Sequence, residues 1–213
     1  MSTEVLRKPS RPGPHRGGEG GGEPGGDGNG RGGPEVFFDP GRFGLWLFLA
    51  TLSMMFVGFT SAYMVRRLAP DWTPLRPPGL LWINTAVLLL SSATLEAARR
   101  RLRGWNPAGV SPWLTATGAL GALFVAGQLA AWRVLAARGY FLSGSPHNSF
   151  FYMLSGIHGL HLLVGLVWFA VVLVKARRLA YTPGEADGLG MFATYWHFLT
   201  GLWIYLLLLL FVL

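Results

Sequence analysis

The sequence predicts an all-α integral membrane protein, a bundle of five transmembrane helices that follows a disordered N-terminal tail. Only 13% of the 213 residues are charged and 51% are hydrophobic, and the hydrophobic residues occur in unbroken blocks. A soluble domain has about 25% charged residues. Because a helix rises about 1.5 Å per residue, a block of about 20 apolar residues matches the ~30 Å hydrocarbon core of a bilayer. These blocks therefore predict membrane-spanning helices.

Residues 1–40 are dominated by Gly, Pro, Arg and Glu, as in the run from Gly17 to Gly22. Such a segment buries too little apolar surface to offset the entropy cost of ordering it. We predict a disordered cytoplasmic tail over residues 1–40, either a tether for a partner or a spacer without a site. The tail lacks the apolar core and the cleavage site of a secretory signal peptide.

Residues 41–213 form the predicted membrane domain. Its hydrophobic segments are separated by linkers that carry Pro, Gly or Asn, residues that end helices. We expect the helices at residues 43–65, 79–98, 112–134, 149–174 and 190–213. The absence of an internal repeat argues against an inverted-repeat transporter.

The distribution of basic residues predicts the orientation of these helices. With a cytoplasmic N-terminus, thirteen of the eighteen Lys and Arg residues lie on the inner side. Without the six in the tail, the inner side still holds seven basic residues, against five on the outer side. Because cytoplasmic loops are enriched in Lys and Arg, we expect the N-terminus inside and the C-terminus outside. Arg66 and Arg67 run against this rule, although long side chains at a helix end can reach the membrane surface.

Several classes of site are absent from the sequence. The chain has no cysteine, which excludes disulfides and thiolate metal sites. It has no phosphate-binding loop, no nucleophile–base pair and no paired carboxylates. We assign no catalytic, cofactor-binding or metal-binding residue, and we expect any chemistry to occur in another polypeptide.

Glu96 is the one acidic residue within a predicted span, near the inner end of the second helix. Arg99 and Arg100 follow it at positions i+3 and i+4, a spacing that favours helical ion pairs. Intramembrane carboxylates are also candidates for proton handling. Both interpretations stay open, with the ion pair preferred.

Three histidines lie within the last two predicted spans. His158 and His161 are three residues apart and share one face of the fourth helix, whereas His197 lies on the fifth. At ~1.5 Å per residue, His161 lies ~18 Å and His197 ~10 Å from the inner helix ends, which argues against one shared haem or metal site. We expect histidines that pack and form hydrogen bonds. Neutral polar residues in the spans are expected to bond between helices, namely Asn84, Ser91, Ser92, Thr94, Gln128, Ser155 and Thr200.

The sequence resembles subunit III of the haem–copper oxidases, the cytochrome c oxidase subunit III family, over roughly residues 43–213. The most specific stretches are Ser155-Gly-Ile-His-Gly-Leu-His161 in the fourth helix and Tyr195-Trp-His-Phe198 in the fifth. Weaker matches are Gly44 to Ala50, Asn84-Thr85, Leu88 to Ser92, Gly127-Gln128, Trp132, Gly165 and Trp203. Family members have seven helices, or five where the first two are absent, and this chain resembles the five-helix form.

The resemblance implies an accessory subunit without redox centres in a bacterial plasma membrane. In that family the haems and copper lie in the catalytic subunit I, and subunit II belongs to the same complex. Subunit III is thought to stabilise its neighbour, support proton uptake and hold phospholipids in a cleft. Candidate residues for contact with lipid or another subunit are Trp46, His158, His161, Tyr195, Trp196 and His197.

Two positions depart from the family pattern. In the family, a Ser-Glu pair usually follows Leu-Phe-Leu-Ala in the first helix, and its glutamate is embedded in the membrane. Here the equivalent pair is Thr51-Leu52, without a carboxylate. Thr200 stands where an aspartate often follows Trp-His-Phe. The proton-handling role of that glutamate is therefore not expected here.

Other functions remain possible from the sequence. A related subunit III-like protein accompanies nitric oxide reductases and shares these motifs. A haem-binding electron-transfer protein that uses His158, His161 and His197 is an alternative from another class. A small-solute transporter is a more distant one, because the spans lack both charge and broken helices.

Overall fold

The computed structural model describes residues 39–72, 77–104, 109–142, 144–177 and 186–212. Within these ranges the fold is all-α, and five helices are long and apolar enough to cross a membrane. This confirms the predicted fold class. The helices are α1 (Pro40–Arg67), α2 (Leu80–Arg103), α3 (Val110–Ala137), α4 (Pro146–Arg177) and α5 (Ala186–Phe211). The predicted tail lies outside the described residues except for its last two positions.

Most of the helices extend beyond the apolar blocks that predicted them. The second span was expected to end at residue 98, but α2 continues through its arginines to Arg103. Basic side chains in the last turn interact favourably with the carbonyl end of a helix. Pro40 occupies the first turn of α1, where proline is tolerated, and the Asp39 carboxylate accepts a hydrogen bond from the Gly41 amide. Hydropathy alone does not detect these polar helix ends.

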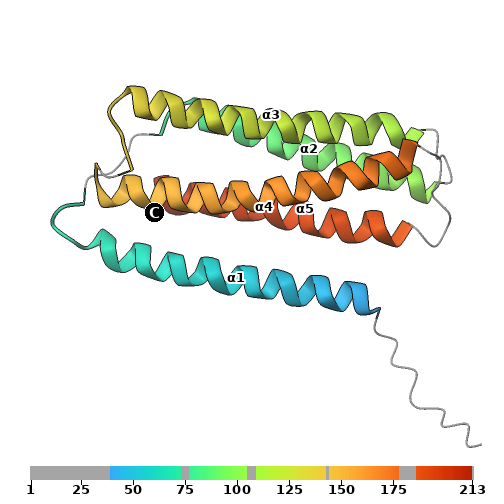
Figure 1. Cartoon of the computed structure of the whole chain (residues 1–213), viewed down its shortest axis with the longest axis horizontal. Coiled ribbons are helices and arrows are strands. Elements are labelled where there is room, and N and C mark those ends of the chain that lie inside the picture. The colour runs from blue at the N-terminus through green and yellow to red at the C-terminus, as the bar shows by residue number, and fades with distance from the viewer. Residues whose placement is uncertain (1–38, 73–76, 105–108, 143, 178–185, 213) are drawn as a thin grey trace, which may run out of the picture. The chain divides into compact units, whose positions relative to one another are not determined.

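Helices α2, α3, α4 and α5 form a four-helix group in which each packs against two others (Figure 1). Helix α1 lies beside this group and contacts only α4 and α5 substantially. The start of α1 and the end of α5 lie at opposite ends of the bundle (Figure 1). Helix α5 is the central element, because it packs against α1, α2 and α4. Half of its most apolar window is buried, against 17% for α1.

Glycines on α3 allow large side chains to approach its backbone. A Cβ atom at Gly121 would lie 2.9 Å from the ring of Trp196 on α5. A Cβ atom at Gly127 would overlap the amide of Asn84 on α2. Small residues are used in this way between membrane helices, where close van der Waals contact replaces hydrophobic burial as the driving force.

Most of the neutral polar residues form the predicted hydrogen bonds between helices. Asn84 donates to the Phe124 carbonyl of α3 over 3.0 Å, and Ser91 donates to the Thr117 carbonyl over 3.1 Å. Further interhelical pairs are Asn84–Gln128, Ser92–His197, Thr94–Thr117 and Trp132–Ser155. The prediction was wrong for Thr200, which donates to the Trp196 carbonyl within α5. A threonine hydroxyl reaches its own i−4 carbonyl more easily than a partner helix.

Replacing Gly127 with alanine tests this packing. The Gly127→Ala variant is expected to displace Asn84 and weaken its bond to Phe124, with a loss of about 1–3 kcal/mol of stability. Gly201→Ala is the matched control, because a Cβ atom there has no neighbour within 4 Å. Alanine has a higher helix propensity than glycine, so both substitutions gain the same local stabilisation. Thermal unfolding in detergent should therefore show a lower midpoint only for Gly127→Ala, and an unchanged midpoint would contradict the packing argument.

Candidate functional site

A layer of polar and aromatic side chains crosses the four-helix group and contains His158. We call it the central polar layer, and it consists of Asn84, Thr85, Gln128, Trp132, Ser155, His158 and Trp203. The Trp203 indole donates to the Thr85 hydroxyl over 3.0 Å, and its ring lies 5.2 Å from the His158 imidazole at an interplanar angle of 30°. Residues from α2, α3, α4 and α5 thus meet at one place, and they include many of those on which the family resemblance rested.

His161 and Tyr195 form a separate contact between α4 and α5. The Tyr195 hydroxyl donates to the His161 carbonyl over 2.8 Å, while the His161 Nδ1 atom lies 2.8 Å from the Ile157 carbonyl of its own helix. The His161 ring also packs edge-on against Phe56 of α1. This contact joins the three helices α1, α4 and α5.

Glu96 is the centre of a charged cluster between α2 and α5. Its carboxylate lies 2.9 Å from Arg99 and 3.7 Å from Arg100, so the predicted i+3 and i+4 ion pairs are both present. The same carboxylate lies 3.9 Å from the Nε2 atom of His197, whose Nδ1 atom is hydrogen-bonded to Ser92. The contact with His197 was not predicted, because spacing along one helix carries no information about the helix opposite.

The three histidines do not converge. His158 faces Trp203, His161 bonds to its own helix, and His197 lies against Ser92 and Glu96. Among the described residues, no group of three His, Asp or Glu side chains could hold a metal ion.

The two candidate tryptophans occupy opposite environments. Trp46 on α1 is 64% exposed on the outside of the bundle. Trp196 on α5 is fully buried, against Gly121 and the rings of Phe169 and Phe192. Trp196 therefore packs inside this chain, and of the two only Trp46 is placed to contact a neighbour.

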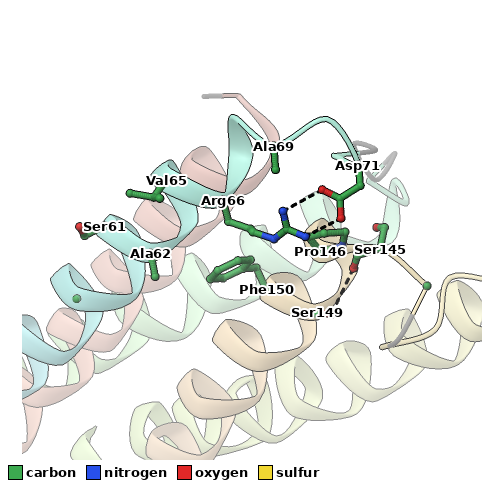
Figure 2. A pocket seen from close by; sticks show the side chains of 12 residues that line it. Ser61, Ala62, Val65, Arg66, Ala69, Asp71, Ser145, Pro146, Ser149 and Phe150 are labelled. Atoms are coloured by element: carbon green, nitrogen blue, oxygen red, sulfur yellow. Dashed lines mark hydrogen bonds and ion pairs between the residues drawn. The ribbon is translucent and has the colours of Figure 1, made fainter.

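A wide groove of about 1150 Å³ separates the end of α1 from the start of α4 (Figure 2). Its lining includes apolar side chains from both helices, Val65 of α1 and Phe150 of α4. Arg66, Asp71 and Ser149 also line it. Figure 2 shows the Arg66 guanidinium facing the Asp71 carboxylate, and the two hydrogen bonds between them measure 2.9 and 2.6 Å. The groove thus combines apolar side chains with one ion pair.

Sequence reasoning missed this groove. It indicated that Arg66 can reach the membrane surface from its helix end, and it did not predict the pair with Asp71, five residues further along the chain. The hydrogen bond from Arg66 lowers the pKa of the exposed Asp71 carboxyl below its usual value. An acidic residue shortly after a helix that ends in arginines was the available signal.

The chain matches the sequence profile described as cytochrome c oxidase subunit III over residues 35–213. It is 33% identical over 181 residues to a cytochrome c oxidase subunit 3 from Synechocystis, which covers 82% of this chain and 76% of the relative. It is 31% identical to the cytochrome bo(3) ubiquinol oxidase subunit 3 of Pseudomonas putida, over 76% of this chain and 80% of the relative. A quinol oxidase subunit 3 from Bacillus subtilis is also 31% identical, over 76% and 82%.

The match to the family profile covers all five helices and therefore the whole membrane domain. The relatives include subunits of both cytochrome c oxidases and quinol oxidases. The chain is thus an integral, multi-pass membrane protein that belongs to the cytochrome c oxidase subunit III family of the haem–copper oxidases.

Proposed function

We propose that this chain is a non-redox accessory subunit that stabilises the catalytic subunit I of a bacterial terminal oxidase, binds phospholipid and holds no haem or copper itself. Subunit II is expected in the same complex. The observation that carries the proposal is the uncovered apolar surface of α1 in a chain of this family. Exposed side chains there include Phe43, Trp46, Leu47, Met54 and Val57.

The exposed face of α1 suits a neighbour in the membrane. A polar group facing hydrocarbon is costly, so a long apolar face is compatible with lipid and with an apolar partner helix alike. Trp46 adds a large flat side chain that can anchor either contact. Among the described residues, α1 packs mainly against α4 and α5, so its other sides suit a contact with subunit I.

The groove beside Arg66 is the proposed binding site for a phospholipid with a zwitterionic headgroup. Its cationic and anionic side chains match the phosphate and the ammonium of phosphatidylethanolamine respectively. An acyl chain can lie between the two helices, against apolar lining residues such as Val65 and Phe150.

The cluster around Glu96 is proposed to fix α2 against α5 rather than to carry protons. Its carboxylate is already shared among Arg99, Arg100 and His197. In the orientation favoured by the basic residues, with the N-terminus in the cytoplasm of a bacterial cell, this cluster lies toward the cytoplasmic side of the plasma membrane.

Deletion of the gene tests the accessory role. The haem spectrum of the catalytic subunit is expected to persist, while the number of turnovers before inactivation falls, because the neighbour loses its support. Oxygen consumption followed to exhaustion measures this lifetime, and re-expression of the intact chain is the control. Unchanged assembly together with an unchanged lifetime would reject the proposal.

Substitution of Arg66 tests the lipid groove. Arg66→Gln should lower the occupancy of phosphatidylethanolamine on the purified chain about tenfold or more, since a charge-assisted hydrogen bond contributes about 1.5–3 kcal/mol. Native mass spectrometry measures the retained lipid. Arg138→Gln, which removes an exposed arginine outside the groove, is the control. Equal lipid retention by the two variants argues against the site.

Glu96→Gln separates the two interpretations of Glu96. As a partly exposed ion pair it should contribute only about 0.3–1 kcal/mol, so the unfolding midpoint drops slightly and oxidase turnover stays within about twofold. Arg101→Gln removes a charge from the same helix end and serves as control. If turnover falls about tenfold in a stable complex, Glu96 handles protons and the structural interpretation is wrong.

A further inference from the structure

A second cavity lies between α3 and α4, about 230 Å³ in volume. Its outer rim consists of Leu129, Leu160 and Leu163, which are 47–60% exposed on the surface of the bundle. Its inner end includes Gln128 and His158 of the central polar layer, which are 5% and 1% exposed. The cavity therefore leads from the hydrocarbon-facing surface to buried polar groups.

These buried groups lack hydrogen-bond partners within the described residues. Both ring nitrogens of His158 and the Nε2 atom of Gln128 are unsatisfied. Ser155 and Trp132, which also line the cavity, already bond to each other over 3.2 Å. An unpaired buried polar group costs about 1–3 kcal/mol, so these atoms favour an occupant that supplies the missing bonds. A neutral imidazole needs both an acceptor and a donor, while the amide needs an acceptor.

The cavity limits the size and charge of that occupant. A cavity of about 150 Å³ holds benzene, so 230 Å³ accommodates a six-membered ring that carries oxygen substituents. No charged side chain lines the cavity, and a charged ligand would lack a counter-ion there. Phe124 and Leu162 offer apolar contacts to the faces of a ring, and the leucine rim suits an apolar tail.

We propose that this cavity binds the ring of a neutral, lipid-soluble quinone or quinol. One ring oxygen accepts a hydrogen bond from the Gln128 amide and from one imidazole nitrogen of His158. In the quinol form, the hydroxyl donates to that nitrogen instead when the imidazole carries its proton on the other one. The tail leaves past Leu160 and Leu163 into the bilayer. The ligand is bound without electron transfer, and the site is independent of the accessory role proposed above.

Ordered water is the main competing occupant. Water can supply the missing hydrogen bonds of Gln128 and His158. It forms no hydrogen bonds with the apolar walls and the leucine rim, and such surfaces stay dry or bind an apolar group. A side chain of a neighbouring subunit is a second competitor. It is absent when the chain is studied alone.

The test uses the full chain in lipid nanodiscs with decylbenzoquinone as the probe. Saturable binding of one probe per chain is expected, and decylbenzene should not compete. His158→Phe and Gln128→Leu should each weaken binding about tenfold, since each removes at least one hydrogen bond. Thr115→Val, on the same helix as Gln128 but outside the cavity, should leave binding unchanged.

A third variant keeps the test valid if His158→Phe or Gln128→Leu fails to fold. Gly159→Leu fills the cavity from its lining, where a Cβ atom meets no other atom within 4 Å, and leaves the polar end intact. It should abolish binding while helix content and unfolding midpoint are retained. The proposal is overturned if binding is unsaturable, if decylbenzene competes equally, if Gly159→Leu binds normally, or if high-resolution density shows water alone.

Discussion

The hydrogen bond from Asn84 to the Phe124 carbonyl is the contact on which the arrangement of the bundle depends. It joins α2 to α3 inside the membrane domain, and it exists only because Gly127 leaves room for the amide. In a bilayer no water competes for such a group, so the bond of a buried amide to a neighbouring helix contributes to the packing of the two helices. The rest of the central polar layer follows from the position of α2 against α3, because Trp203 of α5 bonds to Thr85, the residue after Asn84.

The helices differ in how much of their surface the bundle covers. Helix α5 is enclosed, and its Trp196 and Tyr195 pack within the chain. Helix α1 is mostly uncovered, and its Trp46 is exposed. This difference in burial is compatible with the accessory role proposed above, in which α1 contacts a neighbouring subunit.

The sequence predicted the fold well because membrane helices are specified by local properties. Length and hydropathy alone located five spans, and the i+3 and i+4 spacing located the ion pairs of Glu96. What could not be predicted depends on which helices become neighbours. The pairing of His197 with Glu96, the groove at Arg66 and the cavity beside His158 each combine two helices whose rotation and register are not encoded in any single segment. For the same reason, Thr200 was placed between helices although it bonds within its own.

In the proposed role this chain acts as a partner of the catalytic subunit and not as a redox protein. Haem, iron and copper analysis of the purified full chain distinguishes the two. We expect a colourless preparation with no Soret band and metal far below one atom per chain. One haem, iron or copper bound per chain, and lost when His158, His161 or His197 is replaced, would contradict it.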